Sequence, residues 1–363
     1  RDYPMKPEIR RNLPDKPGIY RMLRSNGDLL YIGKATSLKQ RVNSYFRQKG
    51  PHAEHTLEML SQAADLDVTR TGSALEAAML ESDEIKRHNP PYNVALQTGQ
   101  RKLAFCSGDL QKCAAKPDAI HCIGPLPDGN PTAAMTTFAA WHKNSRVKTG
   151  DNFFKSAYAI LGVSQAYAPE PDCLAEGLAL FRRNHRKRLI DPSAMRILIG
   201  LGRELWNERL KALEKAKSEV VEEKVEETPD DQGEEIEERP IWTPESVARG
   251  IEHSIMHGAL LVRRARWLCL LSESSLAWEA RNADAHRKTV LLFENGAVSL
   301  REELPAEKET PLSAGYTKRI PERQKIFDVT GYERLRVVTT ELRRLVGEGR
   351  KIELRLNTTA VLS

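Results

Sequence analysis

The chain has 363 residues, of which 40% are hydrophobic and 29% are charged, and its net charge is +6. These values predict a soluble globular protein of two or three domains, and no apolar run approaches the roughly 18 residues of a membrane-spanning helix. They exclude a membrane protein, and we expect a cytoplasmic location. The chain begins at Arg1 rather than at a methionine, which leaves room for a lost or processed N-terminal segment.

The charge is unevenly distributed along the chain. The span 219–238 holds eleven acidic residues and one lysine, so the rest of the chain carries about +16. Such a basic excess favours a polyanionic partner, although charge alone does not identify one. We interpret the acidic span as a solvated linker; mimicry of DNA or binding of a basic partner is the alternative.

The cysteines argue against a disulfide framework and against structural zinc. There are five of them, an odd number at irregular spacing, and no CxxC pair occurs. We therefore expect buried or idle thiols in a reducing compartment. The cysteines are Cys106, Cys113, Cys122, Cys173 and Cys269.

The first hundred residues predict alternating short strands and helices. Asn26-Gly27 is a strong hairpin signal, and Pro90-Pro91 ends the last helix. In chain order we expect strands over 17–24 and 28–33, helices over 37–46 and 56–64, a strand over 66–71 and a helix over 73–88. This is an α/β (α+β) domain over 1–100, with a three-stranded antiparallel sheet flanked by helices.

Three further regions follow. Residues 101–217 predict a connecting strand (102–107), a turn at Gly124 to Pro127 and a mainly helical stretch, and 218–240 is the acidic linker. Residues 241–363 predict an α/β accessory domain of unknown role. Within it we expect strands over 267–271, 289–293 and 352–356 and a helix over 332–346.

A two-residue turn fixes a testable register for the predicted hairpin. Ser25 then lies opposite Asp28, Met22 opposite Tyr31, and Tyr20 opposite Gly33. Tyr20 and Tyr31 share a face, and Gly33 leaves an open slot in which a water or a phosphate oxygen could sit beside Tyr20. The alternative is that the two tyrosines are ordinary core aromatics of the hairpin.

Charged residues that suit a phosphate site lie near this hairpin. Lys34 follows the second strand, and Arg41 lies seven residues on, about two helical turns. Together they suit a phosphate, unless both are solvated surface charges. Glu81 lies on the apolar face of its helix, where a carboxylate must be paired, hydrogen-bonded or bound to a metal. Glu76 differs, because Ser73 and Glu76 match a capping box.

Five short elements follow one another here. They are Gly18-Ile19-Tyr20, Tyr31-Ile32-Gly33-Lys34, Arg41 within the stretch 38–46, Leu80-Glu81, and Pro90-Pro91-Tyr92-Asn93. In this order and spacing they resemble the GIY-YIG nuclease superfamily, in particular the N-terminal nuclease domain of UvrC/Cho-like excinucleases. The resemblance covers about residues 12–97 and continues more weakly to about 145.

The resemblance implies a metal-dependent DNA endonuclease that hydrolyses a phosphodiester by a one-metal mechanism. Glu81 would hold one Mg²⁺ or Mn²⁺ ion, Tyr20 would position or deprotonate the attacking water, and Tyr31 and Lys34 would support it. Arg41 would stabilise the charge on the scissile phosphate, and Asn93 would brace the site. A cation at the developing charge and an activated water are what such hydrolysis needs.

Beyond this domain the family's other parts are not recognised. We find no cysteine cluster, no second nuclease of RNase H type and no helix-hairpin-helix tail. The resemblance therefore implies a single incision in nucleotide excision repair, within the SOS response, with loading by a UvrB-like damage-recognition helicase left open. The alternatives are a nuclease of restriction, mobile elements or polymerase-associated processing, and a non-cutting DNA-binding module.

Basic residues outside the five elements are candidate DNA contacts. Each phosphate contact would add salt dependence to binding, and a solvated helix face is the alternative. The weaker run at Arg263, Arg264 and Arg266 is a second possibility, and the histidines at 253 and 257 are interpreted as surface residues. The predicted DNA-binding residues are Lys39, Arg182, Arg183, Arg186, Lys187 and Arg188.

Overall fold

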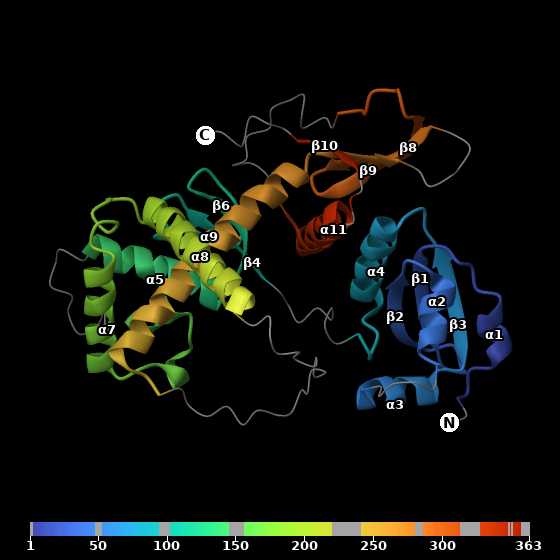
Figure 1. Cartoon of the computed structure of the whole chain (residues 1–363), viewed down its shortest axis with the longest axis horizontal. Coiled ribbons are helices and arrows are strands. Elements are labelled where there is room, and N and C mark those ends of the chain that lie inside the picture. The colour runs from blue at the N-terminus through green and yellow to red at the C-terminus, as the bar shows by residue number, and fades with distance from the viewer. Residues whose placement is uncertain are drawn as a thin grey trace. The chain divides into compact units, whose positions relative to one another are not determined.

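The computed structural model (Figure 1) divides into two compact units. The first unit comprises Arg1–Arg101, Leu270–Ile320 and Phe327–Ser363, and the second comprises Lys102–Cys269 and Pro321–Ile326. Within the described part, no helix is long and apolar enough to cross a membrane. The residues described are 3–47, 53–93, 102–144, 156–219, 241–279, 286–312, 327–347, 349 and 351–356.

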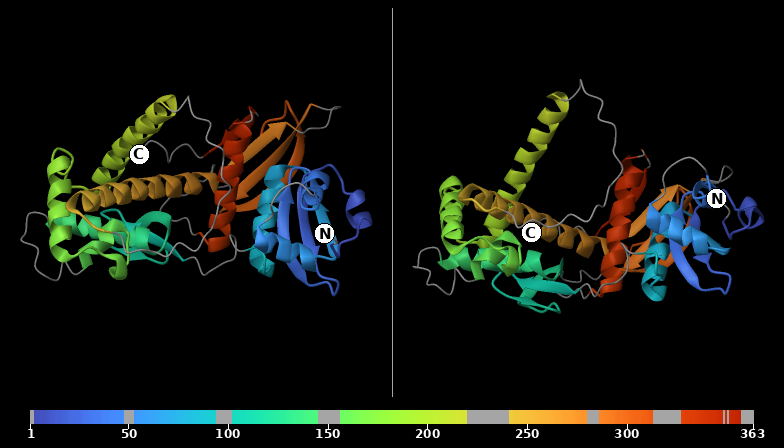
Figure 2. Two further views of the ribbon diagram at one scale, coloured as in Figure 1. Left: turned by 60° about the horizontal axis from the view of Figure 1, so that its bottom comes forward. Right: turned by 90° about the horizontal axis from the view of Figure 1, so that it is seen from below.

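The N-terminal part of the first unit contains the predicted three-stranded sheet. The strand order is β2-β1-β3, and both pairings are antiparallel, which confirms the predicted sheet. Helix α4 packs on strands β1 and β2 (Figure 2). The strands are β1 (Gly18–Leu23), β2 (Leu29–Ala35) and β3 (Asp65–Arg70), and the helices are α1 (Pro7–Arg11), α2 (Leu38–Ser44), α3 (Glu54–Gln62) and α4 (Ala74–His88).

The hairpin register is confirmed along the strands but is wrong at the tip. Met22 lies opposite Tyr31 and Tyr20 opposite Gly33, as predicted. The register then shifts between Met22 and Leu23, and the Arg24 N–H donates to the Asp28 carbonyl at 2.9 Å, so Ser25 does not face Asp28. Among the loop residues between Arg24 and Asp28, Gly27 alone has a positive φ, of 88°. A three-residue loop with a bulge needs one such residue, whereas a type I′ two-residue turn needs two.

Local side chains fix both ends of α4, the helix that carries Glu81. The Ser73 hydroxyl accepts a hydrogen bond from the Glu76 N–H at 3.2 Å, and Asn89 ends the helix in the left-handed conformation with φ of 47°. The Glu76 carboxylate accepts from the Ser73 hydroxyl at 2.9 Å and also pairs with Arg301. The predicted capping box is thus present at Ser73, although Glu76 binds these side chains instead of the backbone at the helix start.

The second unit combines a small sheet with a helical bundle, so the predicted connecting strand and mainly helical stretch are confirmed. Its sheet has the order β5-β4-β6. Helices α5, α7, α8 and α9 share one apolar core. The elements are β4 (Leu103–Ser107), β5 (Cys113–Ala114), β6 (His121–Pro127), α5 (Asn130–Asn144), the short 3-10 helices η2 (Tyr158–Leu161) and η3 (Gln165–Tyr167), α7 (Pro171–Asn184), α8 (Ala194–Glu219) and α9 (Pro244–Leu271).

Three predictions about this unit are wrong. Residues 124–127 belong to strand β6 instead of a turn, and 267–271 form the end of helix α9 instead of a strand. A five-residue apolar run fits a buried helix as well as a strand. Cys106 and Cys113 are not idle thiols: pairing of β4 with β5 brings them together, and they form a disulfide. Cys122, Cys173 and Cys269 are free thiols.

The C-terminal segment returns to the first unit. It forms a four-stranded antiparallel sheet of order β10-β7-β8-β9, and helix α11 packs against α4. The boundary predicted at 241 therefore differs from the structure, in which α9 as far as Cys269 belongs to the second unit. The elements are β7 (Ser275–Glu279), β8 (Arg287–Glu294), β9 (Ala297–Pro305), α11 (Val329–Gly347) and β10 (Ile352–Arg355). Residues 220–240 of the predicted acidic linker lie outside the described residues.

Candidate active site

Tyrosine hydroxyl groups and the Arg41 guanidinium lie close together between β1, β2 and α2. The hydroxyl oxygens of Tyr20 and Tyr45 lie 2.9 Å apart, and Arg41 Nη2 donates to the Tyr45 hydroxyl at 3.2 Å. The Arg41 guanidinium carbon also lies 5.0 Å from the centre of the Tyr45 ring, and the rings of Tyr20 and Tyr31 are 6.1 Å apart. Residues from the hairpin and from the α2 region therefore share one polar cluster.

The slot predicted beside Gly33 is filled. A Cβ atom at position 33 would collide with the ring end of Tyr20 and lie 2.8 Å from the Tyr31 ring, so these phenols occupy the space. Tyr20 is 0% exposed, and its hydroxyl is bonded to that of Tyr45. The predicted open space for a water or a phosphate oxygen at that point is wrong, because the absence of a side chain at Gly33 serves to admit the tyrosine rings.

Burial raises the pKa of both phenols above the ordinary tyrosine value. For Tyr20 the neighbouring Tyr45 and Tyr31 add to the effect of burial, and the Arg41 charge only partly opposes it. For Tyr31 burial also comes first, followed by Tyr45. Both hydroxyls therefore hold their protons at neutral pH in this state, and they can orient an oxygen by hydrogen bonding.

Glu81 is a partly buried carboxylate beside the strand that carries Lys34. Its side chain is 13% exposed, and its Oε1 atom accepts a hydrogen bond from the Lys34 N–H at 2.9 Å. The buried positions Ala77, Ala78 and Ile85 of α4 explain the prediction that Glu81 lies on an apolar face. Burial raises the pKa of Glu81, although the Lys34 charge opposes this. A ligand cation would relieve the cost of burying this charge.

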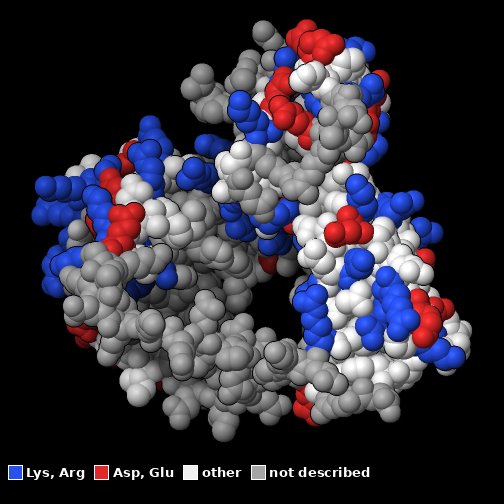
Figure 3. Space-filling model, turned by 45° about the vertical axis from the view of Figure 1, so that its right-hand side comes forward, with Lys and Arg blue, Asp and Glu red and all other residues white. Residues whose placement is uncertain are grey.

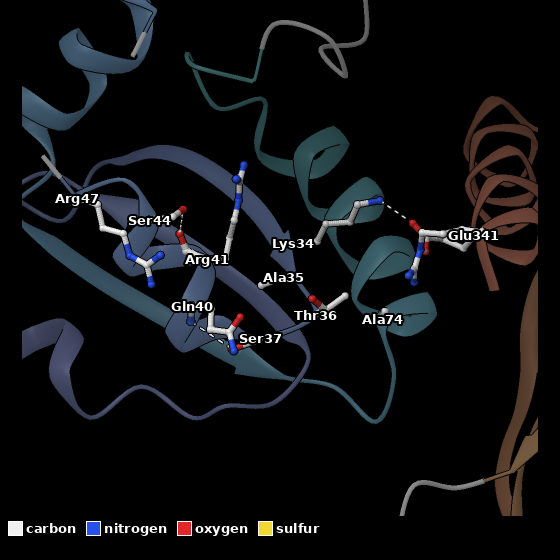
Figure 4. A pocket seen from close by; sticks show the side chains of 11 residues that line it. Lys34, Ala35, Thr36, Ser37, Gln40, Arg41, Ser44, Arg47, Ala74 and Glu341 are labelled. Atoms are coloured by element: carbon white, nitrogen blue, oxygen red, sulfur yellow. Dashed lines mark hydrogen bonds and ion pairs between the residues drawn. The ribbon is translucent and has the colours of Figure 1, made fainter. Parts of the chain in front are cut away.

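Lys34 connects Glu81 to a pocket at the surface. Its Nζ atom lies 4.0 Å from Glu81 Oε2 and 2.9 Å from Oε1 of Glu341 on α11. Figure 4 shows Lys34 reaching toward Glu341 at this pocket, which has a volume of about 660 Å³. Three arginines also line the pocket, Arg41, Arg47 and Arg344. With Lys34, the pocket is lined by four cationic side chains and one carboxylate, so an anion such as a phosphate would suit it.

Asn93 is hydrogen-bonded to the backbone of strand β2, which carries Tyr31 and Lys34. Its side-chain oxygen accepts from the Ile32 N–H at 2.9 Å, and its amide donates to the Ile32 carbonyl at 2.7 Å. Asn93 is 7% exposed. Lys39 on α2 is exposed and does not line the pocket. Figure 3 shows lysine and arginine side chains spread over the described surface, with acidic side chains among them.

The donor set fits a single divalent ion that keeps most of its water. Among the described residues there is no group of three or more His, Cys, Asp or Glu that could hold a metal. Magnesium is commonly bound by one or two carboxylates, with waters and substrate phosphates completing the octahedron. The Glu81 carboxylate, which lies beside Lys34 of the arginine-lined pocket, would meet that requirement as a single protein ligand.

The basic run at 182–188 belongs to the second unit and is only partly helical. Helix α7 ends at Asn184, so the run continues into turns. The Arg182 guanidinium lies 4.9 Å from the centre of the Trp141 ring, and Arg188 pairs with Glu204. Arg183, Arg186 and Lys187 are exposed. Glu252 pairs with His185 at 2.7 Å.

Sequence reasoning missed Tyr45 and Glu341. Tyr45 lies four residues after Arg41 on the same helix, a spacing that brings side chains together, and this signal could have found it. Glu341 contacts Lys34 across 307 positions of sequence. No local pattern points to such a contact.

The N-terminal residues are similar in sequence to known proteins. Residues 16–94 match the family model described as the UvrC-like GIY-YIG domain. The chain is 38% identical over 152 residues to the UvrABC system protein C of Psychrobacter sp. strain PRwf-1, covering 40% of this chain and 24% of that protein. It is 48% identical over 85 residues to the UvrABC system protein C of Moorella thermoacetica. That match covers 23% of this chain and 14% of that protein. The chain thus spans no more than about a quarter of these relatives.

A solved structure is also similar. It is the GIY-YIG N-terminal endonuclease domain of UvrC from Thermotoga maritima, described as bound to its catalytic divalent cation, magnesium. The sequence identity is 34%, the match covers 24% of this chain and 99% of that domain, and the TM-score is 0.22. On the family match and the sequence identities together, residues 16–94 of this chain form a GIY-YIG domain of the UvrC type.

Proposed function

We propose that the chain is a Mg²⁺- or Mn²⁺-dependent DNA endonuclease that makes one incision in nucleotide excision repair. The observation that carries the proposal is the partly buried Glu81 carboxylate, which accepts from the Lys34 backbone N–H within a UvrC-type GIY-YIG domain whose Arg41 lines an adjoining pocket. The UvrABC system named in the relatives supplies the repair context.

The phosphate side of the site rests on two cations. Lys34 and Arg41 line the same pocket, so a scissile phosphate placed there meets an ammonium and a planar guanidinium. Arg41 is held by its hydrogen bond to Tyr45, so its charge is in place before the reaction. Preorganised donors of this kind lower the barrier where negative charge develops on the phosphate.

The water side of the site rests on the hydroxyl cluster. Because the pKa values of Tyr20 and Tyr31 are raised, first by burial, we assign these phenols to orienting the attacking water. Tyr20, fully buried, acts through Tyr45, whereas Tyr31 is partly exposed. A divalent ion bound at Glu81 would supply the Lewis acidity that lowers the pKa of a bound water and neutralises phosphate charge.

Contacts with longer DNA extend the proposal beyond the pocket. Lys39 and the exposed residues of the run at 182–188 are proposed phosphate contacts, which position a duplex without reading its sequence. A UvrB-like damage-recognition helicase is the proposed partner, because the relatives belong to the UvrABC system, and the proposed setting is the cytoplasm.

A nicking assay on defined duplexes tests the repair proposal. Plain, bulky-adduct and branched duplexes are incubated with Mg²⁺, with and without a UvrB-like helicase, and cut products are counted on denaturing gels. We expect incision beside the adduct, dependent on Mg²⁺ and stimulated by the helicase. Cutting of plain or branched duplexes without preference for the adduct would instead indicate a restriction, mobile-element or polymerase-associated nuclease.

A further inference from the structure

Helix α11 is fastened to the helix that carries Glu81. Arg334 of α11 binds both carboxylate oxygens of Asp83 on α4, at 3.1 and 3.2 Å. Arg301 of β9 pairs with Glu76 near the start of α4. The C-terminal sheet and helix therefore meet α4 through several contacts within the first unit, which gives residues of α11 a defined position beside the site (Figure 1).

One of these residues contacts the site directly. Glu341 is 6% exposed, and its Oε1 atom accepts from Lys34 Nζ at 2.9 Å. Its other oxygen, Oε2, accepts from Nε of Arg344 at 2.9 Å. Although burial alone would raise the pKa of Glu341, these hydrogen bonds from Lys34 and Arg344 lower it, so the carboxylate stays ionised at neutral pH. A fixed anion thus stands beside Lys34.

The Lys34 ammonium lies near two carboxylates, those of Glu81 and Glu341. Its Nζ atom is 4.0 Å from Glu81 Oε2 and closer to Glu341. If Glu341 were absent, Glu81 would be the nearer anion for Lys34, and a direct pair there would compete with a metal ion for the same carboxylate. The Lys34 side chain is 42% exposed, and an ammonium has three donors. It can pair with Glu341 and still donate to a phosphate oxygen.

We infer that Glu341 is a positioning residue: from helix α11 it holds Lys34 off the metal-binding carboxylate of Glu81 and at the phosphate pocket. The inference rests on the proposed function. The opposite role, in which Glu341 competes with DNA for Lys34, fits less well, because the pair leaves two ammonium donors for a phosphate. In this chain the C-terminal sheet and α11 therefore complete the nuclease site.

Binding of Mn²⁺ to the full chain without DNA, followed by electron paramagnetic resonance, tests this without relying on activity. Glu341→Gln should weaken Mn²⁺ binding about fivefold, because Lys34 closes on Glu81. In a Lys34→Met background the same change should alter binding less than about twofold, since no ammonium remains to move. Glu341→Asp, which keeps the charge, should restore most of the affinity. Glu333→Gln is the control, because Glu333 lies on the same helix and pairs with Arg336 at 3.5 Å.

The outcomes separate the inference from the proposed function. An equal loss of Mn²⁺ affinity in both backgrounds would mean that Glu341 acts only as a distant charge. Unchanged or tighter Mn²⁺ binding by Glu341→Gln would mean that Glu341 does not position Lys34. Either result overturns the inference. Nicking kinetics of the same variants should show a lower kcat for Glu341→Gln, whereas a competitor of DNA would give faster cutting and tighter DNA binding. If the unaltered chain neither binds Mn²⁺ nor nicks DNA, the proposed function itself fails.

Discussion

At the scale of single residues, the Tyr45 hydroxyl joins the two halves of the site. It bonds to the hydroxyl of Tyr20 at 2.9 Å and accepts from Arg41 at 3.2 Å. Replacing it with phenylalanine keeps the ring that packs under the guanidinium but leaves Tyr20 and Arg41 without that shared partner. Tyr45 thus fixes the position of the Arg41 guanidinium and connects the buried hydroxyl of Tyr20 to it.

Tyr45→Phe is therefore expected to lower kcat for nicking by roughly 10- to 100-fold. This is less than the roughly 100- to 1,000-fold lost with a donor placed directly at a developing charge, because Tyr45 acts through Arg41. DNA affinity should change little, because the cations remain. Single-turnover cutting and a separate binding titration measure the two effects. Tyr3→Phe is the matched control, since Tyr3 packs edge-on against Phe46 in the same core. Equal effects of the two variants would remove Tyr45 from the mechanism.

The partial burial of the Glu81 carboxylate predicts how stability depends on pH. Burial raises its pKa in the folded chain, so its ionised form costs stability at a pH above the ordinary glutamate range. This loss of folding free energy is absent at a pH below the ordinary glutamate range and is complete at a pH above the raised pKa. Glu81→Gln should therefore raise Tm by about 2 °C at neutral pH and by nothing in acid.

Nicking by the unaltered chain should fall as the pH drops through the raised pKa of Glu81, because the metal ligand must be ionised. More Mg²⁺ should move that limb to lower pH. Thermal melts and initial rates across pH check both statements. Destabilisation of Glu81→Gln at neutral pH would show that the carboxylate is well paired in the folded chain without a metal.

Several of these residues follow from sequence and others do not. The helical period places Glu81 on an apolar face, and the hairpin period places Tyr20 and Tyr31 together, so both were predictable. The slot beside Gly33 was predicted wrongly, because the pattern reports a missing side chain and not which neighbour fills the space. Glu341 was not predictable, since its contact with Lys34 depends on the packing of two distant helices.

At the scale of elements, the hairpin depends on a close approach at Gly33. Gly33→Ala would drive a Cβ into the ring of Tyr20, which has no free space because it is fully buried. We expect a loss of about 3 kcal/mol in the free energy of unfolding and loss of nicking as the ring shifts. Urea titrations measure the first effect. Gly108→Ala is the control, because nothing lies within 4 Å of a Cβ there. Full stability of Gly33→Ala would contradict the described packing.

The elements also show where sequence patterns stop being informative. The helical period of apolar residues predicted α4, and Ser73 before it and the prolines after it predicted where it begins and ends. The apolar run at 267–271 was interpreted as a strand because its length suits either structure, and only the long helix α9 around it decides the matter. The hairpin tip was wrong by one residue, since the bulge depends on which loop residue adopts a positive φ.

At the scale of the whole molecule, the basic run at 182–188 should contribute to DNA binding outside the site. Replacing Arg183, Arg186 and Lys187 together with glutamine should reduce the slope of log K against log salt by about 2 to 3. Anisotropy titrations on a fluorescent duplex at several salt concentrations measure the slope. Lys116→Gln is the control, because Lys116 is an exposed lysine of the same unit that lies outside the run. An unchanged slope would mean that the run does not touch phosphates.

The arrangement of the whole chain was the hardest part to predict. Composition and charge indicated several domains, but the sequence order suggested that the C-terminal region stands apart. In the structure the C-terminal sheet and α11 belong to the same unit as the N-terminal domain. Contacts such as Arg334 with Asp83 decide this, and pairing of residues about 250 positions apart leaves no trace in local patterns.

The central claim is that Glu81 holds a divalent ion that cuts DNA. The most direct measurement is nicking of supercoiled plasmid by the unaltered chain, Glu81→Ala and the control Glu84→Ala, whose side chain pairs with Arg21, with and without Mg²⁺. We predict Mg²⁺-dependent nicking that Glu81→Ala lowers by more than about 100-fold, while DNA affinity changes less than about threefold. Continued Mg²⁺-dependent cutting by Glu81→Ala would contradict the account.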